Sequence, residues 1–190
     1  AKEGYQTAFR LGKVTDYALT IKHKDGRLMD VLYNASVYKD DKGNVWIATS
    51  GLGLYKMKTQ TGEFEIFRAS PDDSSSLAGN YIFHLLEDHS KNLWISTADG
   101  GLCFMNQQTG NFKSFTNNPN DPQSLSNNMV LSVFEDGRHR IWVCTADGLN
   151  LLTEKNGFRR FFEKDGLPNN VIYGMLEDEG GALWVSTNKG

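Results

Sequence analysis

Adjacent carboxylates are the residues of this sequence best able to do acid–base chemistry. They occur three times, as Glu87–Asp88, Glu135–Asp136 and Glu177–Asp178. Two carboxyl groups in different environments can separate their pKa values and serve as general acid and general base. One active site needs one such pair, whereas this pair returns at regular intervals. We therefore interpret the aspartates as turn residues whose side chains accept backbone N–H bonds and fix a hairpin.

The other reactive side chains form no recognisable site in the sequence. Four histidines share no ligand spacing, and none pairs with Ser or Cys in a nucleophile motif. They are His23, His84, His89 and His139. Cys103 and Cys144 are too few for a disulfide framework or a cysteine metal site. The glycine pair Gly100–Gly101 precedes an expected strand, and a phosphate loop would need a helix there. The sequence therefore predicts no catalytic residue, no metal site and no cofactor.

A repeat marked by tryptophan runs through most of the chain, with intervals of 48, 48 and 42 residues. Its members are Trp46, Trp94, Trp142 and Trp184. An aspartate stands six residues before each tryptophan: Asp40, Asp88, Asp136 and Asp178. A threonine stands three residues after it: Thr49, Thr97, Thr145 and Thr187. An asparagine stands fourteen residues before the last three: Asn80, Asn128 and Asn170. Such periods are typical of repeat architectures, and one equivalent ring per repeat predicts a core between repeats.

Each repeat predicts four short strands. The run "NYIFHLLED" is apolar nearly throughout, which predicts an innermost strand buried on both faces; "LWIST", "LCFM" and "FKSF" follow, separated by turns. The crossovers "RASPDDSSSLAGN" and "TNNPNDPQSLSNN" are rich in turn residues and predict loops. We therefore expect an all-β fold, a partial β-propeller of four-stranded antiparallel blades with about three to four blades in an open arc. Open blade edges would also allow self-association.

The combined pattern "LxxNxV…ED…LWIST…GL…TGxFxxF" resembles the two-component regulator propeller repeat. The resemblance covers residues 35–190, divided as 35–69, 70–117, 118–163 and a partial 164–190. It implies a periplasmic sensor region of a hybrid histidine kinase, with the rest of a receptor kinase as partner. It also implies an oligosaccharide ligand, because the family is often concerned with sensing oligosaccharides. The residues themselves indicate only the blades.

Residues 1–34 do not keep the period. The segment Tyr17–Val45 contains the turn "HKDGR" between two alternating strands and is similar to the C-terminal β-hairpin of a PAS domain. The alternative is an eroded first blade. A PAS-like part would suit the cytoplasm and the propeller part the periplasm, so the compartment stays open.

Charge and hydropathy exclude two classes of partner. The 190 residues include 20 basic and 23 acidic side chains, giving a net charge of -3 without a block of like charges. This balance argues against a nucleic-acid surface. No apolar run approaches the roughly 18 residues of a membrane span, so we expect no membrane-spanning segment in this chain.

Ligand-binding candidates are positions where the frame is fixed but the residue type changes. Five residues after each tryptophan stand Gly51, Asp99, Asp147 and Lys189, and just after each recurring asparagine stand Tyr81, Met129 and Val171. These positions are expected on turns and strand starts at one end of a propeller, near its axis. We predict a non-catalytic recognition module that binds through Tyr81, Asp99, Met129, Asp147 and Lys189. A protein-interaction scaffold and a propeller lyase or hydrolase remain as alternatives.

Overall fold

The computed structural model describes residues 19–22, 28–31, 37–40 and 42–189, and these form the all-β architecture that the repeat predicts. Blade 1 contains β3 (Val37–Lys39), β4 (Val45–Ala48), β5 (Leu54–Met57) and β6 (Phe64–Phe67). Blade 2 contains β7 (Ile82–Glu87), β8 (Leu93–Thr97), β9 (Leu102–Met105) and β10 (Phe112–Phe115). Blade 3 contains β11 (Val130–Glu135), β12 (Ile141–Thr145), β13 (Gly148–Leu152) and β14 (Phe158–Phe161). A short 3-10 helix (Glu163–Asp165) leads to a two-stranded sheet of β15 (Ile172–Glu177) and β16 (Leu183–Thr187).

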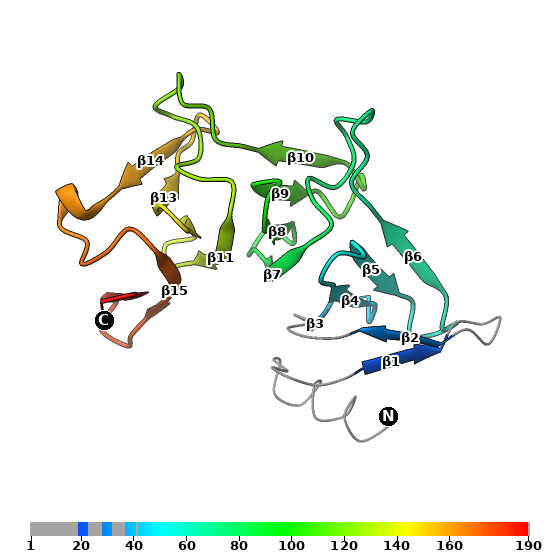
Figure 1. Ribbon diagram of the computed structural model, residues 1–190. Coiled ribbons are helices and arrows are strands. Elements are labelled where there is room, and N and C mark those ends of the chain that lie inside the picture. The colour runs from blue at the N-terminus through cyan, green and yellow to red at the C-terminus, as the bar shows by residue number, and fades with distance from the viewer. Residues whose placement is uncertain (1–18, 23–27, 32–36, 41, 190) are drawn as a thin grey trace.

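The blades follow one another in an open arc (Figure 1). Within each blade the strands pair antiparallel in sequence order, so the first strand is innermost and the fourth is outermost. Strands β6, β10 and β14 lie along the outer side of the arc, and β7, β11 and β15 lie along its inner side. The predicted open arc of four-stranded blades is confirmed.

The recurring aspartate fastens the first hairpin of each blade. In blade 2, Asp88 Oδ1 accepts the backbone N–H of Asn92 at 2.8 Å, and Oδ2 accepts the indole N–H of Trp94 at 2.9 Å. The equivalent bonds from tryptophan to aspartate measure 3.1, 2.8 and 2.7 Å in the other repeats. The fixed spacing of six residues therefore reflects one side chain that satisfies both the turn backbone and the indole N–H of the tryptophan.

The recurring threonine fastens the second turn. Thr97 Oγ1 donates to the carbonyl of Gly101 at 2.7 Å and accepts the N–H of Gly100 at 3.0 Å. Gly101 has φ +80°, and a Cβ there would lie 2.2 Å from the carbonyl oxygen of Phe115. A residue without a side chain is therefore required where this turn passes the outermost strand.

The recurring asparagine joins each blade to the next. Asn128 Oδ1 accepts the N–H of Asn117, just after blade 2, at 2.6 Å, and its carbonyl accepts the N–H of Gly101 at 3.0 Å. Asn80 and Asn170 make the equivalent pairs of bonds at the other two boundaries. We call this arrangement the asparagine joint. It accounts for the third fixed position of the repeat.

Tryptophan and aliphatic side chains fill the spaces between blades. Trp46 packs with Leu85 and Ile95 of blade 2, and Trp94 packs with Val133 and Val143 of blade 3. The third ring, Trp142, packs against Ile172 of β15. All three rings are buried, which agrees with a core role.

The fourth ring differs from this expectation. Trp184 is 61% exposed although its indole bonds to Asp178 like the others. The reason is local, because β15 and β16 are two strands of a sheet over which no further blade lies in the described residues.

The N-terminal segment contains the expected pair of strands. β1 (Leu19–Lys22) and β2 (Leu28–Val31) pair antiparallel, with Leu19 opposite Val31. Their connecting turn, residues 23–27, lies outside the described residues. The PAS resemblance, the boundary at residue 34 and the self-association of open edges stay predictions. Among the described residues, no helix has the length and hydropathy that a membrane crossing requires.

Candidate functional site

The predicted ligand positions lie at the end of the blades where innermost strands begin. The carbonyl of Tyr81 accepts the N–H of Ala98 at 2.9 Å, and that of Met129 accepts the N–H of Ala146 at 3.0 Å. These bonds place the residue after each asparagine beside the turn that follows the second strand. Tyr81 is 53% exposed and Met129 is 42% exposed. We call this end, with its strand starts and second turns, the axial face.

Tyr81 joins two of the predicted positions across a blade boundary. It forms a β-bridge with Ser50, and a Cβ on Gly51 would lie 2.9 Å from its ring. The tyrosine ring therefore occupies space that a side chain at position 51 would fill. One candidate position in blade 1 thus supports the candidate side chain of blade 2.

The other candidates are distributed over successive boundaries. Asp99 and Asp147 are exposed on the second turns of blades 2 and 3, and the N–H of Asp147 donates to Thr145 Oγ1 at 3.2 Å. Val171 is half-buried, and its N–H donates to Asn169 Oδ1 at 2.9 Å. Lys189 Nζ lies 4.0 Å from Glu163 Oε1, so this side chain has an acidic partner close to it. The candidate residues follow the arc, one group at each boundary.

Bulges in the innermost strands of the last three repeats add residues that sequence reasoning missed. The pairing steps from Ile82 to His84 in β7 and from Ile172 to Gly174 in β15, which leaves Phe83 and Tyr173 as extra residues. A bulge redirects a side chain, and Phe83 is 38% and Tyr173 52% exposed. The expectation that innermost strands are buried on both faces is therefore wrong at these positions. The sequence of the apolar run does not reveal these exposed rings, because the bulge that redirects them depends on how the two strands pair.

A hollow of about 630 Å³ lies elsewhere, along the outer strands β13 and β14. Leu151, Phe158, Arg140, Lys155 and Arg159 are among the residues that line it. None of the predicted ligand positions contributes to its wall. The hollow and the exposed rings of the axial face thus indicate two different candidate sites for a ligand. The axial face is the better candidate for a ligand site, because exposed apolar side chains stand near the strand starts of three successive repeats: Tyr81 and Phe83, then Met129, then Tyr173.

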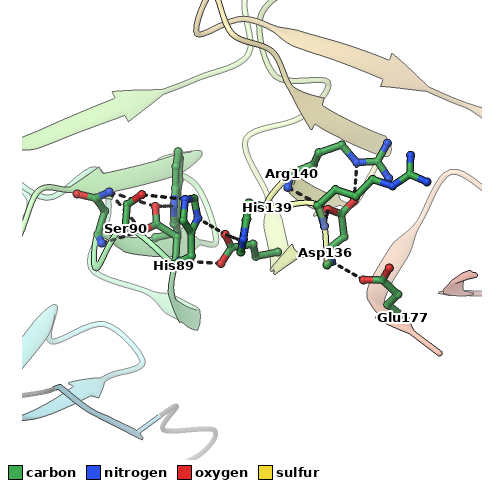
Figure 2. Close-up of polar contacts among 12 residues, drawn as sticks. His89, Ser90, Asp136, His139, Arg140 and Glu177 are labelled. Atoms are coloured by element: carbon green, nitrogen blue, oxygen red, sulfur yellow. Dashed lines mark hydrogen bonds and ion pairs between the residues drawn. The ribbon is translucent and has the colours of Figure 1, made fainter. Parts of the chain in front are cut away.

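The opposite end of the blades shows how the carboxylate pairs are used. Each aspartate binds its own turn, whereas Glu135 and Glu177 reach the turn of the previous blade (Figure 2). Glu87 instead bonds to Lys91 and Gln107 of its own blade. Glu135 Oε2 accepts the N–H of His89 at 2.9 Å, and Glu177 Oε2 accepts the N–H of Gly137 at 2.5 Å. In the second and third pairs the two members therefore serve different blades, which is an arrangement for holding turns together.

Asp136 illustrates the electrostatics of these turns. Burial alone would raise the pKa of its carboxyl, but hydrogen bonds from the Trp142 indole and the Arg140 backbone and guanidinium outweigh burial, so the pKa is lowered. Arg140 Nε lies 2.6 Å from Asp136 Oδ2. The carboxyl is thus held as a carboxylate at neutral pH.

Two histidines gather around the glutamate between blades 2 and 3 (Figure 2). His89 Nδ1 lies 2.5 Å and His139 Nδ1 3.2 Å from Glu135 Oε1, and the two imidazole centroids are 4.0 Å apart. The three donor atoms lie within 4.8 Å of one another, and within the described part of the chain no other group of His, Cys, Asp and Glu has this geometry. We call it the turn cluster. Sequence reasoning missed it because His89 follows its aspartate by one residue and His139 by three.

Comparison with protein families matches residues 27–51, 76–99, 124–147 and 166–189 to the two-component regulator propeller. The chain belongs to this family. The last three matched segments of this two-component regulator propeller begin before an innermost strand and end at the turn after the second strand. They therefore contain the asparagine, aspartate, tryptophan and threonine whose bonds are described above. No curated protein matches the sequence.

Solved structures share the fold of this regulator propeller. Virginiamycin B lyase from Staphylococcus aureus is 15% identical with a TM-score of 0.59, over 88% of this chain and 55% of the lyase. A gluconolactonase from Xanthomonas campestris is 12% identical with a TM-score of 0.53, over 89% and 62%. The extracellular domain of a hybrid two-component system from B. thetaiotaomicron is 17% identical with a TM-score of 0.42, over 92% and 39%. The chain thus spans 39 to 62% of the length of these structures. The likeness to the lyase and the gluconolactonase concerns the fold alone.

Proposed function

We propose that this segment is a non-catalytic ligand-recognition module of a two-component signalling receptor. Family membership supports the receptor context. The observation that carries the recognition role is the row of exposed apolar side chains on the axial face. Tyr81, Phe83, Met129 and Tyr173 stay accessible at or just before the starts of innermost strands, although most other large apolar residues are buried between blades. Clustered exposure of this kind is typical of binding surfaces.

The ligand class that suits this face is an oligosaccharide. A sugar ring presents an apolar face, which can stack on Tyr81, Phe83 and Tyr173, and hydroxyl groups, which can donate to carboxylates such as Asp99 and Asp147. Several similar subsites along an arc would suit a chain of similar units. A periplasmic location, where polysaccharide fragments reach a receptor, is part of this proposal, as is a connection to the rest of a receptor kinase.

A propeller lyase or hydrolase is the second candidate, since virginiamycin B lyase and gluconolactonase share the fold. Such an enzyme needs an acid and a base within reach of one substrate bond. The adjacent carboxylates Glu87–Asp88, Glu135–Asp136 and Glu177–Asp178 lie at the far end of the innermost strands from the axial face. A protein-interaction scaffold would use the same exposed rings, and the ligand test below separates it from an oligosaccharide receptor.

Titration calorimetry with a panel of neutral and acidic oligosaccharides tests the proposal. For any oligosaccharide that binds, Tyr81→Ala removes a stacking contact of roughly 0.5 to 1.5 kcal/mol, and Asp99→Ala removes one hydrogen bond of roughly 0.5 to 1.5 kcal/mol. Each variant should therefore weaken affinity about 2- to 12-fold. Glu87→Ala, at the opposite end of the same blade, is the matched control and should leave affinity unchanged.

Chromatography of the same mixtures tests for turnover. We expect the oligosaccharides to be recovered intact. Product formation that disappears in Glu87→Ala would establish an enzyme, and binding that is indifferent to Tyr81→Ala and Asp99→Ala would place the ligand away from the axial face.

A further inference from the structure

We propose that the turn cluster, His89, Glu135 and His139, is a binding site for a divalent transition-metal ion such as Zn²⁺, which would link blades 2 and 3. The site is independent of the axial face, because it lies on the turns at the other end of β7 and β11. It requires no ligand there and no receptor partner.

The backbone positions the three side chains. His89 lies on the turn after β7, which Asp88 fastens, and His139 lies on the turn after β11, which Asp136 fastens. Glu135 closes β11, and its Oε2 accepts the His89 backbone N–H at 2.9 Å. That bond fixes the carboxylate so that Oε1 remains directed at both imidazoles (Figure 2). The donors therefore come from elements held by other contacts.

The distances suit a metal after a small side-chain rotation. Zinc binds imidazole nitrogen at about 2.0–2.1 Å and carboxylate oxygen at about 2.0–2.2 Å, so tetrahedral donors lie about 3.4 Å apart. Glu135 Oε1 and His139 Nδ1 are 3.2 Å apart. His89 Nδ1 is closer to the same oxygen, at 2.5 Å, and must rotate outward. Its side chain is 48% exposed and that of His139 60%, so both can rotate without disturbing the core.

A neighbouring hydroxyl can serve the metal-binding tautomer of His89. Ser90 Oγ lies 3.1 Å from His89 Nε2. When a metal ion bonds to Nδ1, the imidazole carries its proton on Nε2, and the Ser90 hydroxyl is placed to accept that proton. Outer hydrogen bonds of this kind orient metal-binding histidines. Ser90 is thus a positioning residue.

Two imidazoles and one carboxylate select the class of ion. Imidazole favours Zn²⁺, Cu²⁺, Ni²⁺ or Fe²⁺ over Mg²⁺ and Ca²⁺, which prefer all-oxygen sites. Three protein ligands leave a fourth position open to water or a ligand atom. The competing arrangement is a hydrogen-bonded cluster in which Glu135 accepts a proton-bearing Nδ1 from each histidine. It predicts a structural role without affinity for metal.

Chelator-treated full chain titrated with Co²⁺ and Zn²⁺ distinguishes these arrangements. We expect saturation at one equivalent of Co²⁺, with the visible absorption of a low-symmetry Co²⁺ site. This absorption should disappear when Zn²⁺ displaces cobalt. Zn²⁺ should also raise Tm, because the ion binds only the folded chain. His139→Gln and Glu135→Gln should each weaken Zn²⁺ binding by at least about tenfold, the lower end of what loss of even an outer partner does. Ser90→Ala should weaken it less.

Two conservative variants serve as controls. Glu177→Gln alters the equivalent glutamate of the next repeat. Glu177 accepts the N–H of Gly137 as Glu135 accepts that of His89, but it is not a member of the turn cluster. His84→Gln removes a histidine from β7 outside the cluster. Both should bind Zn²⁺ like the wild type. Absence of one-equivalent binding, or an affinity that His139→Gln and Glu135→Gln leave unchanged, would overturn the proposal. Glu135→Gln that lowers Tm in a protein without a Zn²⁺ response would establish the hydrogen-bonded cluster instead.

Discussion

Replacing Asp88 by Ala should destabilise the protein far more than the same change at Asp178. The two aspartates make equivalent bonds, to the turn backbone and to an indole N–H. Their surroundings differ, because Trp94 is 4% exposed whereas Trp184 is 61% exposed. The pair therefore separates the contribution of the bonds from the contribution of burial.

The expected size follows from the groups left without a partner. Asp88→Ala removes the acceptor of the Trp94 indole N–H and of the Asn92 backbone N–H. A buried donor left unsatisfied costs about 1–3 kcal/mol. The Trp94 indole is buried and Asn92 is half-buried, and the two are close enough not to add fully, so we expect about 3 kcal/mol in total. For a chain of this length that lowers Tm by about 6–12 °C. At Asp178 water can replace the lost acceptor, and Tm should stay close to that of the wild type.

Thermal and urea unfolding, followed by far-ultraviolet circular dichroism and by tryptophan fluorescence, measure both variants. Asp88→Asn is the matched control, since it keeps one oxygen as an acceptor and should lie between wild type and Asp88→Ala. Equal losses of Tm at positions 88 and 178 would refute the argument from burial. A loss at neither would show that these bonds contribute nothing net to stability.

Two further predictions concern titratable side chains. Hydrogen bonds outweigh burial and lower the pKa of Asp136, so the folded state binds this proton less readily than the unfolded chain does. The stability gained is therefore present above about pH 4 and is lost as the pH falls further. Asp136→Asn should flatten the acid limb of a Tm–pH curve, and an unchanged limb would contradict this. Burial raises the pKa of Cys103 and Cys144 to about 11. At pH 8 both thiols should therefore react with a disulfide reagent only after denaturation. Rapid labelling of either thiol in the folded chain would show that its blade opens.

The blades were predictable because each fixed residue acts within or next to its own repeat. The spacing of Asp88 and Trp94, and of Thr97 and Gly101, reflects bonds that every hairpin must make. The exposure of Trp184 was not predictable in the same way. Its neighbours in sequence match those of Trp94, but its exposure depends on what lies over the sheet.

The candidate sites were only partly predictable. Exposure of Tyr81 and Met129 agrees with their expected place at strand starts, since a residue next to a turn is covered on fewer sides. Phe83 was missed because a bulge depends on how two strands pair and leaves no mark in an apolar run. The turn cluster was missed because His89 and His139 stand 50 residues apart at unequal distances from their aspartates, and only the packing of blades brings them together.

At each boundary between blades, the asparagine joint uses one side chain and one carbonyl, and both reach no further than the adjoining blade. A gene segment that encodes one complete repeat therefore carries its own connector. Duplication or deletion of such a segment by recombination leaves every remaining connector with both of its partners. Chains with different numbers of blades can arise in single genetic steps, and selection then needs to alter only the variable side chains of the axial face.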